Sequence, residues 1–566
     1  MTILRSKSWV DIPNDTSISE LMLQNVSNTP LNKIIYEDAL TGKTTTYGAF
    51  QEHVQRAAYW LRHTIGFKPG QTLSISSPSS TEYIVVVHAV WWLGGVASLV
   101  NNSLHQSEIA HALDLINPNF LVVHDSVFEK ASESLKLCEK HHDIRVLTLG
   151  KRSAQWTAFP AVSLPAAHPK IGKPYSLKGK DARKHLAGIL LSSGTTGRPK
   201  AVMLSHYNLV AAIHQLRGDN PDNWRGSQRE IFFPPLSHVY ALYVCITGCF
   251  WLGAYVCLMP RFDLELYCRL MQDRNATLAR LVPPIAKMLA ENPVVRKYSY
   301  PSLEYFSCSA APLTAETAEK LSKAFPHVAL CQTYGCTELS GPCVQSGVRD
   351  KTMALGASGK LIANTEMRFL DLDCKDVGAS GPGEITVRGP NVFMWVPICN
   401  PFCVKRRGYK DDELTTQESM IDGDWLRTGD LGYIDKDGFL VLYDRLKDII
   451  KYKGFQVSPL ELEDIAHRHP LVDEVAICGV WSESEATELP RAYVVLKKEV
   501  EKSPTHLSRH AESISNFVSE KVSTYKQLRG IVFVDDLPKN PTGKILRRVL
   551  RMEREKYENG PIRAKL

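Results

Sequence analysis

The sequence predicts an α/β protein, in which a large N-terminal domain of layered sheets with a β-rich part precedes a small C-terminal α+β domain. Three observations support this prediction. The 566 residues exceed what one small core can use. Apolar, β-branched runs alternate with helical patterns from about residue 33 to residue 387. Beyond residue 383 the pattern changes to short strands separated by turns.

The individual elements follow from local patterns. Helical periodicity covers Tyr47–Ile65 and Thr314–Ala324, and strand-like runs such as TLSISS, FLVVH and LAGILLSS occur in the same part of the chain. In the β-rich part, the Asp437-Gly438 pair predicts a hairpin turn. After residue 447, strand-like runs accompany helical patterns at Pro459–His467 and Ala511–Val522. About 120 residues remain there, which is enough for a separate domain.

One stretch has the length of a membrane-spanning helix. Residues 239–259 are mostly apolar, and residues 231–260 contain no Asp, Glu, Lys or Arg. Gly253 divides the stretch into a helix-like part and the β-like run AYVCLM. We therefore predict a buried helix followed by a buried strand, and no transmembrane segment. Residues 84–100 are interpreted in the same way, as a core helix that leads into a strand.

Charge and cysteine content exclude several classes of protein. The net charge of +7 is mild and scattered along the chain, which argues against nucleic-acid binding and suits anionic substrates such as nucleotides. Thirteen cysteines occur without a CxxC pair or zinc-finger spacing, so reduced, buried thiols are expected. The N-terminal residues lack the apolar core of a signal peptide, which predicts an intracellular protein.

The strongest local motif is LSSGTTGRPK at residues 191–200, which follows the apolar run LAGIL and precedes a helix-like run from Ser205. Small hydroxyl residues and glycines let backbone N–H groups surround phosphate oxygens, and a lysine adds positive charge. The spacing differs from that of a Walker loop, and a polar turn between strand and helix is the alternative interpretation. The predicted phosphate-binding residues are Ser192, Ser193, Gly194, Thr195, Thr196, Gly197 and Lys200.

Three further motifs follow in order: QTYGCTE at residues 332–338, RTGDLGYIDKDGFLVLYDRLKDIIKYKGFQVSPLELE at 427–463, and PKNPTGKILRR at 538–548. Together with the phosphate loop, they resemble the acyl-adenylate-forming (AMP-binding) superfamily, in particular its 4-coumarate:CoA ligase-like branch. The resemblance covers nearly the whole chain. It implies an acid:CoA ligase that uses ATP, Mg²⁺ and CoA. Such an enzyme converts a carboxylic acid into its acyl-adenylate, releases pyrophosphate, and transfers the acyl group to the thiol.

The resemblance also implies roles for single residues. A carboxylate that attacks the α-phosphate meets several negative charges, so cations and a metal are needed there. Glu338 and Thr195 are the expected Mg²⁺ ligands. The expected adenylate contacts are Thr337 at the α-phosphate, Tyr334 and Gly335 at the adenine, and Asp430 and Arg445 at the ribose, with Lys544 as the adenylation lysine. Singly, each charged residue could equally be a surface charge in a turn.

The second half-reaction is implied to use another face of the small domain. The resemblance predicts a large domain at residues 1–443, a hinge at 444–447 that includes Lys447, and a small mobile domain at 448–566 that rotates about it. After rotation, Lys451 and Gln456 are expected to contact the adenylate, while Lys453 and Gly454 lie beside CoA. For the two lysines, the alternative is a charged edge strand.

The acyl pocket is implied to be formed by Tyr240, Val244, Ser309, Ala310, Ala311 and Thr333. His238 is expected between this pocket and the adenylate; alternatively it is an ordinary core histidine. Ser309 and Thr333 stand where the family has glycines and add volume. A smaller aromatic acid or a medium-chain acid, possibly of secondary metabolism, is therefore expected rather than 4-coumarate.

Two further features bear on location and chain integrity. The tripeptide Ala564-Lys565-Leu566 is close to the Ser-Lys-Leu address read by the peroxisomal import receptor, so we expect a peroxisomal protein, with the cytoplasm as the alternative. The segment WVPICNPFCVKRR at residues 395–407 interrupts the pattern of the family. It is either a surface loop or a translated, unspliced intron.

Alternative functions remain open at this point. Within the superfamily, the chain could be a stand-alone adenylating enzyme that loads a carrier protein, or a luciferase-like oxygenase. A non-catalytic binding protein is disfavoured because Glu338, Asp430, Arg445 and Lys544 are all present. The sequence leaves open the acid, the acceptor thiol and the oligomeric state.

Overall fold

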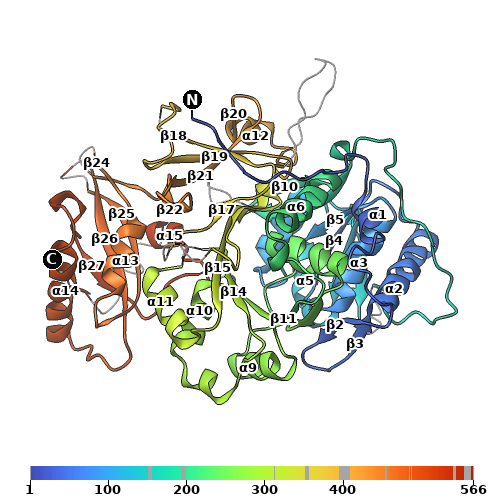
Figure 1. Cartoon of the computed structure of the whole chain (residues 1–566), viewed down its shortest axis with the longest axis horizontal. Helices are drawn as coiled ribbons and strands as arrows, with labels where there is room; N and C mark the ends of the chain where they lie inside the picture. The colour runs from blue at the N-terminus through green and yellow to red at the C-terminus, as the bar shows by residue number, and fades with distance from the viewer. Residues whose placement is uncertain are drawn as a thin grey trace.

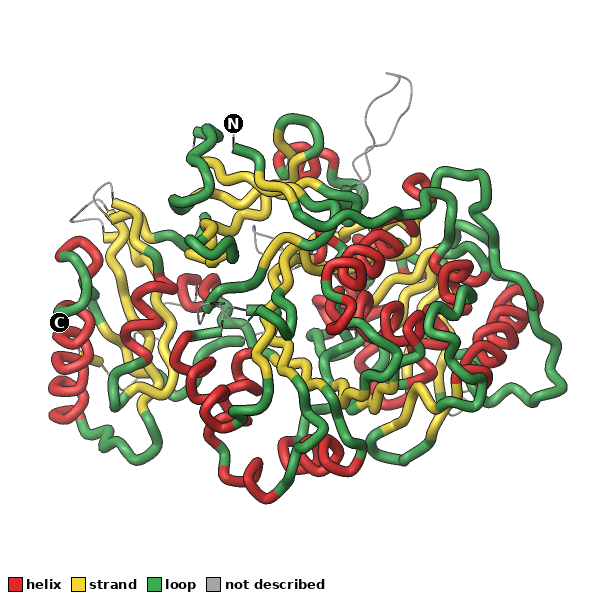
Figure 2. The backbone as a smooth tube through the Cα atoms, viewed as in Figure 1, coloured by secondary structure: helices red, strands yellow, loops and turns green. Residues whose placement is uncertain are grey.

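The structure is a computed structural model that describes residues 2–150, 156–192, 199–311, 313–350, 353, 356–371, 373–393, 408–452, 455–482, 485, 487–539, 543–552 and 563–564. Layered sheets and helices of the large domain occupy the right and centre of Figure 1, and a smaller C-terminal body lies at the left. The tube in Figure 2 shows helices on the outside of these sheets. The predicted α/β fold class is confirmed.

The first layer is a seven-stranded sheet in the order β10-β9-β5-β4-β6-β7-β8. Its strands are parallel except for the antiparallel pair β9–β10. The strands are β4 (Thr72–Ser76), β5 (Val96–Leu99), β6 (Phe120–His124), β7 (Arg145–Leu149), β8 (Thr157–Ala158), β9 (Leu186–Ser192) and β10 (Lys200–Ser205). The helices of this part are α1 (Ile18–Met22), α2 (Tyr47–Trp60), α3 (Thr81–Trp92), α4 (Gln106–Ile116), α5 (Phe128–Leu137) and α6 (His206–Asp219).

Two smaller sheets form the second layer, in the orders β11-β12-β2-β3 and β13-β14-β15-β16-β17. The first contains β2 (Ile34–Asp38), β3 (Thr44–Thr46), β11 (Arg229–Phe232) and β12 (Tyr255–Leu258). The second contains β13 (Leu278–Leu281), β14 (Tyr305–Cys308), β15 (Ala329–Cys336), β16 (Gly341–Gln345) and β17 (Lys360–Leu361). They are accompanied by α9 (Leu264–Asp273), α10 (Pro283–Glu291) and α11 (Ala315–Ala324), close to the predicted helix at Thr314–Ala324.

The β-rich part is a sheet in the order β1-β18-β19-β21-β20, with β22 paired to β21. Its elements are β1 (Leu4–Arg5), β18 (Glu366–Leu370), β19 (Gly383–Arg388), α12 (Glu413–Glu418), β20 (Met420–Ile421), β21 (Trp425–Ile434) and β22 (Leu440–Arg445). The expected hairpin turn lies between β21 and β22, where Gly438 has φ +84°. Glycine adopts this left-handed conformation without the steric cost that other residues meet.

The C-terminal body has its own hydrophobic core, which includes Ile450, Leu462, Ile477, Val494 and Ile514. A four-stranded sheet, a short hairpin and the helices α13 and α14 enclose this core, while Leu550 of α15 belongs to a second cluster with Ala476 and Tyr493. These elements are β23 (Ile450–Tyr452), β24 (Phe455–Val457), α13 (Pro459–His467), β25 (Val472–Ser482), β26 (Thr487–Leu496), α14 (Pro504–Ser519), β27 (Ile531–Phe533), α15 (Arg547–Met552) and β28 (Arg563–Ala564).

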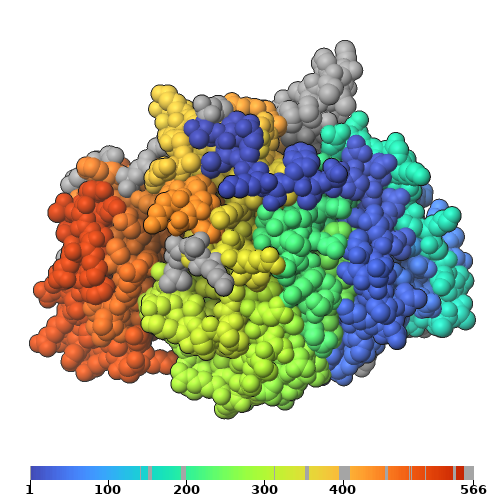
Figure 3. Space-filling view, viewed as in Figure 1, coloured from blue at the N-terminus to red at the C-terminus, as the bar shows by residue number. Residues whose placement is uncertain are grey.

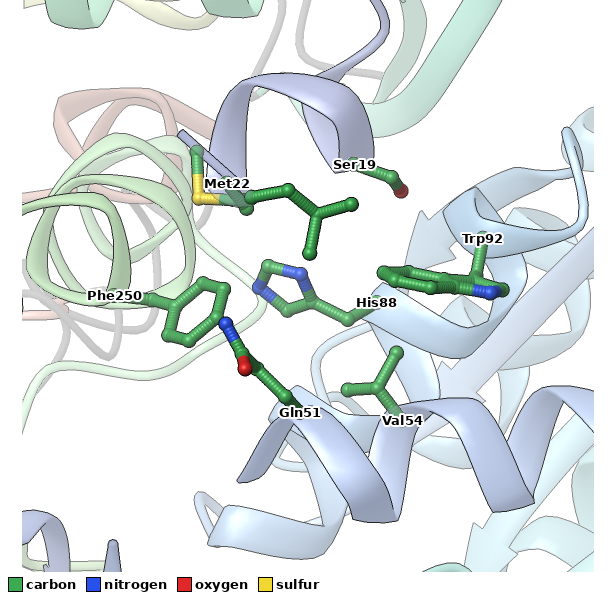
Figure 4. A pocket seen from close by; sticks show the side chains of 8 residues that line it. Ser19, Met22, Gln51, Val54, His88, Trp92 and Phe250 are labelled. Carbon is green, nitrogen blue, oxygen red and sulfur yellow. The ribbon is translucent and has the colours of Figure 1, made fainter. Parts of the chain in front are cut away.

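The long apolar stretch forms the predicted buried helix and strand. The helix consists of three consecutive segments, α7 (Val239–Ala241), η6 (Leu242–Cys249) and α8 (Phe250–Leu252). Strand β12 follows after Gly253. Within the described residues, none of the helices has both the length and the apolar character needed to span a membrane. Figure 4 shows how the end of this stretch packs, with Phe250 beside His88 of α3 and Gln51 of α2. His88 Nε2 donates a hydrogen bond of 2.8 Å to the Ile246 carbonyl, and the ring is buried in the core.

One sequence prediction was wrong in its bounds. The helix predicted at Ala511–Val522 is α14, which begins at Pro504 and ends at Ser519. Proline suits the first turn of a helix because it lacks the N–H that would be unsatisfied there.

The helix expected from Ser205 is α6, which begins at His206 with Ser205 as its N-cap. The motif at residues 191–200 therefore precedes this helix, as predicted. The structure adds that β10 lies between them and pairs antiparallel with β9.

Gly335 offers a test of the β15–β16 junction, where the pairing register shifts between Tyr334 and Gly335. A Cβ at Gly335 would lie 2.1 Å from the Gly341 carbonyl oxygen, and backbone atoms cannot move aside cheaply. Gly335→Ala should therefore lower the thermal midpoint and reduce the free energy of unfolding by about 1–3 kcal/mol. Gly381→Ala, whose Cβ would meet open space, is the matched control in the same thermal denaturation. Equal midpoints for both variants would contradict this packing.

Candidate active site

A cavity of about 300 Å³ lies between the large domain and the C-terminal body. In the space-filling view of Figure 3, the orange and red C-terminal part packs directly against the yellow and green part of the large domain. Lys287 Nζ and Asp473 Oδ1 form an ion pair of 2.9 Å across this boundary. The predicted site residues that line the cavity are Ser309, Ala310, Ala311, Thr333, Tyr334, Gly335, Asp430, Arg445 and Lys544.

Asp430 joins three strands at the cavity. Its Oδ2 accepts a hydrogen bond of 2.8 Å from the Tyr334 hydroxyl of β15. Its Oδ1 lies 3.1 Å from Arg445 Nε, and these two residues are paired partners on β21 and β22. Burial lowers the pKa of Arg445, but Asp430 and Asp448 raise it on balance, so the guanidinium stays cationic. A carboxylate and a guanidinium at a cavity wall can bind the hydroxyls of a sugar.

Lys544 reaches the same cavity from the C-terminal body, on the segment before α15. Burial and the neighbouring Arg445 lower the pKa of its ammonium group to about 7, while Asp430 opposes this shift. Gly543 beside it has φ +80°, and a Cβ there would lie 2.7 Å from Pro284 Cγ. The chain therefore approaches the large domain closely at the point where it delivers the lysine.

His238 lies at the N-terminus of α7, where its Nδ1 accepts a hydrogen bond of 3.1 Å from the Tyr240 N–H. Burial, and next the positive charge of Lys544, lower the pKa of His238 to about 4. The imidazole is therefore neutral near pH 7, and it lies close enough to Lys544 for the two groups to interact electrostatically. A neutral ring beside a cation can orient a substrate carboxylate without adding another charge.

The phosphate loop is only partly described. Ser192 ends β9, and its buried hydroxyl has no hydrogen-bond partner among the described residues. Lys200 begins β10 opposite Ser192, and its Nζ lies 4.8 Å from the centre of the Tyr409 ring. The remaining predicted loop residues, Ser193, Gly194, Thr195, Thr196 and Gly197, lie outside the described residues.

Glu338 and Thr337 follow β15 in the short helix η8 (Thr337–Leu339). The Tyr409 hydroxyl donates a hydrogen bond of 2.9 Å to Glu338 Oε1. Within the described part of the chain there is no cluster of three or more His, Cys, Asp or Glu that could hold a metal ion by itself. A single carboxylate fits Mg²⁺ that arrives with a nucleotide, because that ion usually keeps waters and phosphate oxygens as its other ligands.

None of the described residues of β23 and β24 lines the cavity. Lys451 is exposed and faces Gln456 in the hairpin pairing, and its N–H donates to Glu488 Oε2 at 2.7 Å. Lys453 and Gly454 lie outside the described residues. Burial lowers the pKa of Lys447, at the predicted hinge. The structure thus brings Lys544 to the cavity and leaves Lys451 away from it.

The predicted acyl-binding residues divide into two groups. Ser309, Ala310, Ala311 and Thr333 line the cavity, and Ser309 Oγ donates to the Thr333 carbonyl at 3.3 Å. Ala310 has φ +75°. Tyr240 and Val244 are buried in the helical stretch behind this wall and do not line the cavity.

Sequence reasoning did not assign several residues that belong to this site. Tyr409 contacts both Glu338 and Lys200, and it lies just after the unusual segment 395–407, which falls outside the described residues. Gln332 and Ser358 are buried and line the cavity. Gln332 is the first residue of the motif QTYGCTE. This position in the motif is the sequence signal that could have identified it.

The predicted targeting tripeptide is described only at its first residue. Ala564 belongs to β28, where it pairs with Ile531 of β27. Lys565 and Leu566 lie outside the described residues.

Comparison with known proteins identifies the family. The AMP-binding enzyme family matches residues 23–395, and the AMP-binding enzyme C-terminal domain family matches residues 461–544. Probable 4-coumarate–CoA ligase 2 of Dictyostelium discoideum is 31% identical over 548 residues, which cover 94% of each chain. Peroxisomal OPC-8:0-CoA ligase 1 of Arabidopsis thaliana is 31% identical over 523 residues, 92% of this chain and 90% of that protein.

Solved structures agree with the fold. The ATP-bound structure of MatB from Rhodopseudomonas palustris superposes with a TM-score of 0.81 at 25% identity, covering 95% of this chain and 99% of MatB. The anthranilate CoA ligase AuaEII with anthranoyl-AMP has the same fold, with a TM-score of 0.81 at 21% identity and coverage of 96% and 98%. The four motifs, the shared architecture and the two matched domains lead to one conclusion: the chain belongs to the AMP-binding enzyme family.

Proposed function

We infer that this chain is an ATP-dependent, AMP-forming acid:CoA ligase. The observation that carries the inference is the interdomain cavity, where Asp430, Arg445 and Lys544 meet beside the motif residues Tyr334 and Gly335. Relatives across nearly the whole length of the chain are named as CoA ligases. The reaction joins a carboxylate to the α-phosphate of ATP, releases pyrophosphate, and then transfers the acyl group to the CoA thiol.

We propose the following roles for the chain's own residues. Asp430 and Arg445 bind the ribose, while Tyr334 and Gly335 contact the adenine. Lys544 lies between the carboxylate and the α-phosphate, where a cation offsets the charge that develops as the two anions meet. Neutral His238 orients the carboxylate from the other side. The buried position of Lys544 strengthens each of these interactions because little water screens them.

We propose that Glu338 holds Mg²⁺ that enters with ATP, and that Thr195 assists it. When bound, the ion offsets phosphate charge and aligns the phosphate chain. The Tyr409 hydrogen bond occupies one oxygen of Glu338 and fixes the direction of the carboxylate. Lys200 and the loop of residues 192–197 bind the β- and γ-phosphates in this proposal.

Transfer to the thiol is proposed to use the hairpin of Lys451 and Gln456 after rotation about residues 444–447, with Lys453 and Gly454 beside CoA. The exposed position of Lys451 supports a role in a state other than the one described here. A carrier-protein loader or a luciferase-like oxygenase would share the first half-reaction and differ only in the second.

We propose a smaller aromatic acid or a medium-chain acid as the substrate. Ser309 and Thr333 supply side chains at the cavity wall, and Tyr240 and Val244 close the space behind it. The volume left for an acyl group is therefore reduced at two points of the wall.

We also propose a peroxisomal location. The tail Ala564-Lys565-Leu566 supports it, as does one relative whose name includes the peroxisome.

The function is tested with purified protein, ATP, Mg²⁺, CoA and a panel of carboxylic acids. At least one acid should give AMP and its CoA thioester in equal amounts. Lys544→Ala should slow AMP formation by roughly 100-fold or more, because a cation aimed at the developing charge is lost. The same variant should still convert supplied acyl-AMP and CoA into thioester. Acid-dependent pyrophosphate exchange without any thioester would instead indicate a carrier-protein loader.

The size of the acyl pocket is tested by Ser309→Gly with Thr333→Gly. Removing both side chains from the wall enlarges the pocket. Bulkier aromatic acids should therefore gain in kcat/KM relative to the best small acid. A change of about tenfold is expected, in line with the effect of one or two side-chain atoms in an apolar pocket. An unchanged acid profile would show that these residues do not limit the pocket. Melting temperatures should accompany the assay to confirm that the variant is folded.

The pH dependence of adenylation follows from Lys544. Its pKa of about 7 means that the cationic fraction falls as the pH rises through 7. Because kcat/KM reports the free enzyme, kcat/KM for pyrophosphate exchange should decrease above about pH 7. Lys544→Arg keeps its charge over this range and should shift the decrease to higher pH. A flat wild-type profile between about pH 6 and pH 9 would contradict the assignment.

A further inference from the structure

Helix α13 of the C-terminal body forms one wall of the cavity. Its residues in the cavity lining are Leu460, Glu463, Asp464 and His467. They are spaced three and four residues apart, so they lie on a single face of the helix. Figure 1 shows α13 on the side of the C-terminal body that is nearest to β22 and α11 of the large domain. The contacts at the two ends of this helix therefore affect how the two bodies are held together.

The N-terminus of α13 is bound by a carboxylate of the large domain. Asp444 belongs to β22, where it is the Cα partner of Leu431 on β21. Its Oδ2 accepts a hydrogen bond of 2.6 Å from the Ser458 hydroxyl and one of 2.9 Å from the Leu460 N–H. The first N–H groups of a helix have no partner within the helix, and the helix dipole favours a negative charge there. A residue of the large domain thus completes the N-terminal cap of a helix in the other body.

The C-terminal end of α13 contacts the large domain as well. His467 is the last residue of the helix, and its Nδ1 lies 3.2 Å from Glu316 Oε2 on α11. Glu316 also pairs with Lys320 of its own helix at 2.7 Å. Burial raises the pKa of Glu316, but the hydrogen bonds from Lys320 and His467 lower it on balance, so the carboxylate stays charged. Both ends of α13 are therefore joined to acidic side chains of the large domain.

The proposed reaction needs these contacts to form and also to break. Lys544 reaches the cavity from the C-terminal body, so the first half-reaction takes place while the two bodies are in contact. The acyl-adenylate then lies between the bodies, and the CoA thiol still has to reach its carbonyl carbon. Single hydrogen bonds and ion pairs suit this cycle, because each contributes little net free energy and opens without disturbing the apolar core of either body.

We propose that α13 is a latch with two ends, bound by Asp444 at its N-terminus and by Glu316 at its C-terminus, which holds the cavity closed for adenylation and sets how often it opens to the thiol. The proposal rests on the proposed ligase function and adds a control over the balance between its two half-reactions. Asp444 lines the cavity, whereas Glu316 does not. Glu316 is therefore the position at which the latch can be weakened without a change in the cavity wall.

The test compares the two half-reactions in Glu316→Gln: acid-dependent pyrophosphate exchange, and thioester formation from supplied acyl-AMP and CoA. The substitution keeps the size of the side chain and removes its charge, so the open arrangement should become more frequent. Because an ion pair at a protein surface shifts an equilibrium by roughly two- to fivefold, the ratio of thioester formation to pyrophosphate exchange should rise by about that factor. His467→Asn should raise the ratio equally, and the double variant should add nothing further, because both changes remove the same contact.

Glu319→Gln is the matched control. Glu319 lies on the same helix α11, and its half-exposed carboxylate pairs with Lys323 at 2.7 Å, as Glu316 pairs with Lys320. The control removes the same charge and the same kind of pair within the helix, without the contact to His467. Its ratio of thioester formation to pyrophosphate exchange should equal that of the wild type.

Amide hydrogen exchange measures the latch without catalysis. In the protein without substrates, Asp444 protects the Leu460 N–H only while the latch is closed. Exchange in residues 458–467 should therefore be roughly two- to fivefold faster in Glu316→Gln than in the wild type and in Glu319→Gln. Asp444→Ala should accelerate it further, whereas Asp444→Asn keeps an acceptor oxygen and should have a smaller effect.

The outcomes separate the latch from the reaction itself. Melting temperatures identify any Asp444 variant that fails to fold, and the Glu316 variant then tests the proposal by itself. A ratio of the two half-reactions in Glu316→Gln equal to that in Glu319→Gln would overturn the proposal. Faster hydrogen exchange in Glu316→Gln, but no thioester with any acid in the wild type, would support the latch and contradict the ligase function.

Discussion

The Asp430 carboxylate is the interaction on which the geometry of this site depends. It contacts Tyr334 and Arg445, which come from two different sheets of the large domain, and it offsets part of the charge of Lys544 from the C-terminal body. Two buried cations near one another repel strongly in a medium of low dielectric constant. Asp430 opposes the lowering of the Lys544 pKa that burial and Arg445 cause, so it helps the lysine to remain cationic beside the arginine.

The pKa of Lys544 shows how this balance would respond to a ligand. Burial, and next the positive charge of Arg445, lower that pKa even with Asp430 nearby. Phosphates of a nucleotide would add negative charge beside the ammonium group and return the pKa of the lysine toward its ordinary value. Two side chains that line the cavity also join the two bodies, because Lys287 pairs with Asp473 and His467 contacts Glu316.

Sequence patterns predicted the layers, most helices and the motif residues that line the cavity, because strand alternation, helical periodicity and short motifs are local properties. They did not reveal that residues 193–198 connect two antiparallel strands, since a polar loop has the same composition before a strand as before a helix. The contacts of Tyr409 with Glu338 and Lys200 were also hidden. These residues are far apart in the chain, and only the folded sheets bring them together.

The Glu230–Arg280 pair illustrates the same limit and also what a structure adds. In sequence, Arg280 interrupts the apolar run LARLV. In the fold, its strand partner is Ser307, and Glu230 accepts a hydrogen bond of 2.7 Å from its guanidinium. A carboxylate alone would demand a cation, and an arginine alone would demand an anion. The two together are neutral as a unit, which allows two charged side chains to lie in the core of the large domain.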